Sequence, residues 1–133
     1  METAEQSKFS ILIVDDSEEL LDVLSIVLKQ QGHYVFIKAK PDTIIRFVKE
    51  IRIDLLLLDV VYGTYGEING RNVCRKLKSD PLTNYFPIIL MSVIYENLVD
   101  FKDCGADDVI EKPFDLHELI QKINSCLHEE SAN

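Results

Sequence analysis

Short apolar runs alternate along this chain with segments in which apolar residues recur every three or four positions. Runs rich in Ile, Val and Leu lie at 9–14, 34–37, 55–58, 87–91 and 109–110. The first four runs are nearly continuous rather than alternating, which is typical of strands that are covered on both faces. The pattern therefore predicts five strands, most of them buried in the middle of a layered fold.

Helical spacing between these runs predicts five helices. Three have clear apolar stripes, made of Leu20, Leu24, Val27 and Leu28, of Ile44, Phe47, Val48 and Ile51, and of Leu116, Leu119, Ile120, Ile123 and Leu127. Val73 and Leu77 predict a shorter helix over about 71–78, and Leu98 and Phe101 give a thin stripe for another before Gly105.

Residues at the helix ends agree with this division. Ser17 and Asp115 are good N-caps, and Pro41 suits the first position of a helix. Gly32 and Gly105 follow two of the predicted helices and suit their C-terminal ends.

Strict alternation of five strands and five helices predicts an α/β fold. It would be a doubly wound parallel sheet with helices on both faces and right-handed crossovers. The length of 133 residues suits a single domain over 1–133. We expect a core over about 9–127, with loose tails at 1–8 and 128–133.

Charge and composition narrow the possible functions. Asp and Glu outnumber Lys and Arg by 23 to 14, which gives a net charge of −9. Such an acidic chain is a poor partner for nucleic acid or for an anionic membrane surface. No apolar run approaches the roughly 18 residues of a membrane span. The three widely spaced cysteines suggest reduced thiols, and therefore a cytoplasmic protein.

Polar residues stand where the predicted strands end. Asp15 and Asp16 follow the first strand, Asp59 the third, Ser92 the fourth and Lys112 the fifth. Because the carboxyl ends of parallel strands meet at one edge of the sheet, we expect these side chains to converge there.

This set of side chains is suited to a metal ion and a phosphoryl group. Clustered carboxylates repel one another, and so raise a pKa or bind a cation. Their oxygen ligands favour Mg²⁺ or Ca²⁺ over zinc. Lys112 and Ser92 supply a positive charge and a hydroxyl donor for phosphoryl oxygens. Asp59 is the best candidate for a nucleophile that forms an aspartyl-phosphate.

In this order, the residues resemble the receiver domain of two-component response regulators. The resemblance is carried by 14–16, 56–59, 89–92 and 105–114, and it extends over about 9–127. It implies a flavodoxin-like (βα)5 fold with strand order 2-1-3-4-5, similar to stand-alone chemotaxis regulators. It also implies a cis peptide bond between Lys112 and Pro113.

The resemblance implies a role for each residue that matches the family. Asp59 would accept a phosphoryl group from the phosphohistidine of a histidine kinase or a histidine phosphotransfer protein. Asp16 would bind Mg²⁺ directly, Asp15 largely through water, and the backbone carbonyl of Val61 would complete the shell around the ion with Asp59. Lys112 would pair with Asp59 or its phosphate. Ser92 would move towards a phosphoryl oxygen, and the altered surface would bind a downstream effector protein.

Two features depart from the family. Val109 stands where an aromatic residue is usual, so we expect a signal to travel through the loop after Ser92 and the fourth helix. The loop over 60–70 is about three residues longer than usual, and it contains Gly63, Gly66 and Gly70. Both features favour an alternative, a pseudo-receiver that acts as a constitutive protein-interaction module.

A third hypothesis is a Mg²⁺-dependent phosphohydrolase with an aspartyl nucleophile. That chemistry usually requires Asp-x-Asp, and position 61 is Val. We therefore expect a signalling switch that assists its own phosphorylation and dephosphorylation rather than a turnover enzyme.

Overall fold

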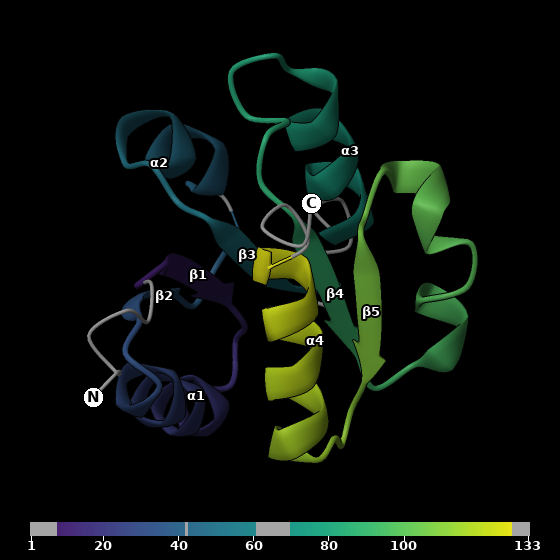
Figure 1. The fold of residues 1–133 in the computed structure, drawn as a ribbon. Coiled ribbons are helices and arrows are strands. Elements are labelled where there is room, and N and C mark those ends of the chain that lie inside the picture. The colour runs from purple at the N-terminus through teal and green to yellow at the C-terminus, as the bar shows by residue number, and fades with distance from the viewer. Residues whose placement is uncertain (1–7, 42, 61–69, 129–133) are drawn as a thin grey trace.

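A computed structural model describes residues 8–41, 43–60 and 70–128, and Figure 1 shows its fold. Five strands form one parallel sheet in the order β2-β1-β3-β4-β5. The strands are β1 (Ser10–Val14), β2 (Tyr34–Lys38), β3 (Leu55–Asp59), β4 (Ile88–Ser92) and β5 (Asp108–Glu111). The predicted doubly wound α/β fold and its strand order are confirmed.

Helices cover both faces of this sheet. They are α1 (Glu18–Gln30), α2 (Ile44–Glu50), α3 (Gly70–Ser79) and α4 (Leu116–His128). Figure 1 shows α1 and α4 on one side, with α2 and α3 on the other. None of the helices in these ranges has the length and apolar character that a membrane crossing requires.

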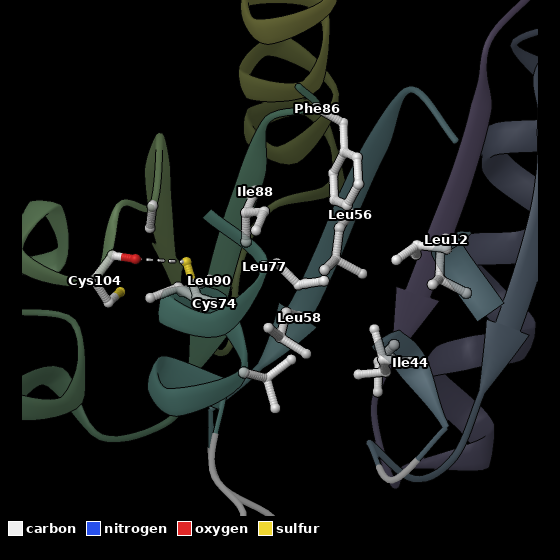
Figure 2. Close-up of a cluster of buried hydrophobic side chains, with 14 of the residues drawn as sticks. Leu12, Ile44, Leu56, Leu58, Cys74, Leu77, Phe86, Ile88, Leu90 and Cys104 are labelled. Carbon is white, nitrogen blue, oxygen red and sulfur yellow. Dashed lines mark hydrogen bonds between the residues drawn. The ribbon is translucent and has the colours of Figure 1, made fainter. Parts of the chain in front are cut away.

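Alternate residues of each strand enter two different cores. In β1, Ile11 and Ile13 pack in the layer that contains α1 and α4, whereas Leu12 and Val14 pack in the layer that contains α2 and α3. β3 and β4 are buried along their whole length, which explains why their sequences are continuous apolar runs. Figure 2 shows the second core, in which Leu56 and Leu58 lie among side chains of α2, α3 and β4.

The predicted helix ends are largely confirmed. The Ser17 hydroxyl accepts a hydrogen bond from the Leu20 backbone N–H at 3.2 Å, and the Asp115 carboxylate accepts one from the N–H of His117 at 2.8 Å. Gly32 and Gly105 have φ values of +98° and +89°, which only glycine adopts without strain.

The prediction of a fourth helix, before Gly105, is wrong. Its place is taken by two single 3₁₀ turns, η2 (Tyr95–Asn97) and η3 (Phe101–Cys104). Asp100 lies between them in the left-handed region, with φ 56°, and this conformation interrupts any continuous α-helix. The segment buries few apolar side chains, so packing against the sheet does not offset this interruption.

One smaller expectation about a helix end was also wrong. Pro41 does not begin α2, because Thr43 is the N-cap and the carbonyl of Pro41 accepts a turn hydrogen bond from Ile44 at 3.2 Å. In α1 the predicted Leu24 and Leu28 are buried and Leu20 is partly buried against the same core, and Leu21, which lay outside the predicted stripe, is buried as well.

We expect Leu56→Ala to destabilise the protein by about 2–5 kcal/mol, because Leu56 is fully buried at the centre of the sheet and the smaller side chain would leave a cavity. Urea unfolding followed by circular dichroism measures this change. Ile26→Ala on α1 is the control, since Ile26 is 58% exposed and its loss should cost less than about 1 kcal/mol. Equal losses in the two variants would contradict this account of the core.

Candidate functional site

The polar residues predicted at the strand ends come together at one edge of the sheet. Asp15 directly follows β1, Asp59 and Ser92 end β3 and β4, and Lys112 directly follows β5. Neighbouring strands are paired in register up to these ends, with Asp59 opposite Met91 and Ser92 opposite Glu111. The sheet itself therefore fixes the positions of the backbone atoms that carry the site.

Lys112 lies between two buried carboxylates. Its ammonium group donates a short hydrogen bond to Oδ2 of Asp15 and lies 3.3 Å from Oδ1 of Asp59. The side chains of Asp15, Asp59 and Lys112 are 0%, 5% and 15% exposed. One positive charge is thus shared by two carboxylates that have little contact with water.

Local backbone contacts orient this cluster. The second oxygen of Asp15 accepts a hydrogen bond from the Ser17 N–H at 2.9 Å. The Lys112–Pro113 peptide bond is cis, as the family resemblance implies. The N–H of Lys112 donates to the carbonyl of Ser92 at 2.8 Å, which holds the start of this loop against the end of β4.

Asp16 completes an acidic pocket. Asp15, Asp16 and Asp59 each offer one carboxylate oxygen, and these atoms lie within 4.8 Å of one another. Asp16 is exposed, so the pocket opens to solvent on one side. A set of ligands made only of oxygens fits a hard divalent cation, and three carboxylates around one ammonium leave negative charge to be balanced. The pocket could therefore bind a metal ion.

The environment of Asp59 changes its acidity. Burial, and to a smaller extent the negative charge of Asp15, raise the pKa of Asp59 to about 6, although Lys112 partly opposes both effects. The Asp59 carboxyl is thus costly to ionise in the metal-free protein, yet remains mostly ionised at neutral pH.

Ser92 is fully buried beside this cluster. Its hydroxyl oxygen accepts a hydrogen bond from the N–H of Ile94 at 3.0 Å and a longer one from the side-chain amide of Asn97 at 3.5 Å. The hydroxyl is therefore linked to the segment that follows β4. Sequence reasoning missed Asn97, because its approach to Ser92 depends on the η2 turn and leaves no signal in residue spacing.

The chain beyond Asp59 is only partly described. Val61, proposed as a metal ligand through its carbonyl, lies outside the described residues, as do Gly63 and Gly66. Gly70 packs directly on the end of β3, and a Cβ atom there would lie 2.7 Å from the carbonyl oxygen of Asp59. Val109, which replaces the usual aromatic residue, is half-buried in β5 against the core layer of α2 and α3.

The family model of the response regulator receiver domain matches residues 11–124. The chain belongs to this family. Receiver domains are parts of two-component signalling systems, so the fold, the order of the strand-end residues and the family agree.

Individual relatives support the same family. The chain is 34% identical over 119 residues to the DNA-binding response regulator MtrA of Mycobacterium tuberculosis, which corresponds to 88% of this chain and 50% of that protein. This chain spans about half the length of the curated relatives it matches.

Solved receiver structures match nearly the whole chain. The signal receiver domain of a histidine kinase from Syntrophus aciditrophicus is 30% identical with a TM-score of 0.81, and 91% of each chain is covered. A response regulator from Chloroflexus aurantiacus is 26% identical with a TM-score of 0.82, and covers 91% of this chain and 98% of its own.

We expect Asp59→Asn to stabilise the metal-free receiver domain at pH 7, because it removes a buried negative charge. A raised acid pKa means that the folded state binds a proton more tightly than the unfolded state. The free energy of unfolding of the wild type therefore falls as the pH rises from about 4 to about 6, because Asp59 then ionises in a buried site. The stability gain of the variant should be near zero at pH 4 and on the order of 1–3 kcal/mol above pH 6.5.

Urea unfolding in EDTA across this pH range measures the gain. Asp22→Asn is a matched control, since Asp22 is an exposed carboxylate on α1 outside the site. A wild-type domain that is more stable than Asp59→Asn at pH 7 would contradict the electrostatic description of the site.

Proposed function

We propose that this receiver domain is a Mg²⁺-dependent phosphoacceptor switch that carries a phosphoryl group on Asp59. The observation that supports it best is the position of the Asp59 carboxylate, which is buried at the end of a central strand within reach of Lys112 and two further aspartates. A histidine kinase or a histidine phosphotransfer protein would supply the phosphoryl group.

The transfer would be a displacement at phosphorus. An oxygen of the ionised Asp59 carboxylate forms the new O–P bond, the P–N bond to the donor histidine breaks, and its electron pair returns to the imidazole. Lys112 lies 3.3 Å from the attacking carboxylate, and its ammonium balances charge on the phosphoryl oxygens. Ser92 adds a hydroxyl donor from the neighbouring strand.

Asp16, Asp15, Asp59 and the carbonyl of Val61 would hold the Mg²⁺ ion. When bound, the ion neutralises part of the negative charge shared by the carboxylates and the phosphoryl group. Asp15 and Asp16 keep their carboxylates beside that of Asp59, and Lys112 stays paired with Asp15. The domain thus assists its own phosphorylation and dephosphorylation without being a turnover enzyme.

The surface beside the site suits the approach of a protein donor. A groove of about 510 Å³ opens next to Lys112, and its walls include Leu20, Val93, Phe114 and Leu116. These apolar walls would pack against the surface of a protein donor that approaches the site. The proposal includes a cytoplasmic location and a downstream effector protein as the second partner, with no direct contact to nucleic acid.

Intact-mass measurement after incubation with phosphoramidate tests the proposal. We expect wild-type protein with Mg²⁺ to gain one phosphoryl group that is released by hydroxylamine, as acyl phosphates are. Asp59→Asn should gain none, and EDTA should prevent the gain in wild type. Asp22→Asn is again the matched control and should be modified like wild type, because Asp22 lies outside the acidic pocket.

Two results would contradict the proposal. Modification of wild type and Asp59→Asn to the same extent would place the phosphoryl group on another residue. No modification of wild type by phosphoramidate or by a phosphorylated histidine donor would favour the pseudo-receiver alternative.

A further inference from the structure

The side chain of Arg71, on α3, bonds the backbone of residues 97–100 in the segment after β4. Nη1 of Arg71 donates hydrogen bonds to the backbone carbonyls of Asn97 at 3.0 Å and Val99 at 2.9 Å, and Nη2 donates one to the carbonyl of Asp100 at 3.0 Å. A guanidinium group has its donors in a rigid planar fork, and lysine cannot make such a set of bonds. Arg71 therefore fixes the backbone of this segment over four consecutive residues.

Apart from the bonds to Arg71, few contacts hold the backbone of residues 97–100 in place. Asp100 has a left-handed φ of 56°, which a residue with a side chain adopts at a cost. Between Val93 and Asp100, only Leu98 is buried. Farther along, Cys104 is buried, and its carbonyl accepts a hydrogen bond from the thiol of Cys74 at 3.3 Å, as Figure 2 shows. The part of the segment around Cys104 is thus anchored by packing, whereas residues 97–100 are held mainly by Arg71.

Arg71 also stands next to the candidate site. The preceding residue, Gly70, donates a backbone hydrogen bond to Val60 at 3.2 Å and packs on the carbonyl of Asp59 without room for a side chain. The start of α3 is therefore fixed relative to the backbone of Asp59. Through its hydrogen bonds, Arg71 therefore fixes residues 97–100 relative to the backbone of Asp59.

Asn97 connects the same segment to Ser92. Its carbonyl accepts from Arg71, while its side-chain amide donates to the Ser92 hydroxyl oxygen. The N–H of Ile94 donates to the same oxygen at 3.0 Å. If the Ser92 side chain changes rotamer to bring its hydroxyl to a phosphoryl oxygen on Asp59, both of these bonds are lost. Residues 94–97 then rearrange while Arg71 holds the carbonyl of Asn97 in place.

We propose that Arg71 is a positioning residue that opposes this rearrangement and so restrains the phosphorylation switch. The inference rests on the proposed function of Asp59. Because coupling between two sites is reciprocal, a contact that favours the arrangement described here also disfavours the phosphorylated form. Loss of the guanidinium group should loosen the segment and make phosphorylation of Asp59 easier.

Amide hydrogen exchange of the unphosphorylated protein tests directly whether Arg71 stabilises the backbone of residues 97–100. The backbone N–H groups of Asn97, Leu98 and Gly105 are suitable probes, because each is bonded within the segment. In Arg71→Gln we expect Asn97 and Leu98 to exchange about tenfold faster or more. Gly105, which follows the buried Cys104 and donates to the carbonyl of Lys102, should change less. Arg71→Lys should behave like Arg71→Gln, since a lysine keeps the charge but not the fork.

The phosphorylation rate with phosphoramidate and Mg²⁺ tests the coupling. Because the loosened arrangement would be the one that reacts and the variant populates it more, we expect Arg71→Gln to be phosphorylated about fivefold faster than wild type. In a Ser92→Ala background the same substitution should leave the rate unchanged while exchange remains faster, because no hydroxyl is left to turn. Arg75→Gln is the matched control on α3, since the exposed Arg75 donates to the side chain of Asn72 on the same helix.

The outcomes separate this inference from the proposed function. Unchanged exchange in Arg71→Gln would overturn the role of Arg71 while leaving Asp59 as the phosphoacceptor. Faster exchange with an unchanged phosphorylation rate, or full recovery of wild-type behaviour by Arg71→Lys, would also overturn it. Failure of wild type to be phosphorylated on Asp59 would overturn the proposed function, and the coupling with it.

Discussion

The interaction on which this site depends is one ammonium group between two buried carboxylates. Lys112 contacts Asp15 and Asp59, neither of which has appreciable contact with water. Two like charges about 4 Å apart repel by roughly 4 kcal/mol at an effective dielectric near 20. A single lysine compensates only one of them, so the cluster retains negative charge even before the exposed Asp16 is counted. Burial raises the pKa of Asp59, the neighbouring negative charge of Asp15 adds to that rise, and the uncompensated charge favours a cation beside it.

The sheet makes such an unfavourable cluster possible. Asp15 and Lys112 are 97 residues apart in the chain and come from strands on either side of β3 and β4. Their positions are set by strands whose side chains fill two apolar cores, one on each face of the sheet. The stability of these cores offsets the electrostatic cost of the strand ends, which is a common division between scaffold and site.

Sequence reasoning succeeded where a local pattern and a buried environment agree. Continuous apolar runs predicted the strands, and the polar residue after each run predicted the edge where Asp15, Asp59, Ser92 and Lys112 meet. It failed for the fourth helix, because Asp100 adopts a left-handed conformation there and the segment is held by contacts from residues distant in sequence, such as Arg71. The contact between Asn97 and Ser92 was missed for the same reason, since it exists only in the tertiary fold.

The two sides of the site are built differently, and this difference bears on how a signal could leave it. On the β5 side, Lys112 is fixed by its backbone bond to Ser92 and by its contact with Asp15, and the half-buried Val109 has no ring that could change orientation. On the other side, the first half of the segment after β4 depends on hydrogen bonds, with Leu98 as its buried residue. Hydrogen bonds exchange partners at a lower cost than a packed core rearranges. Movement that begins at Ser92 should therefore spread through 93–100, where Arg71 limits it, rather than through β5.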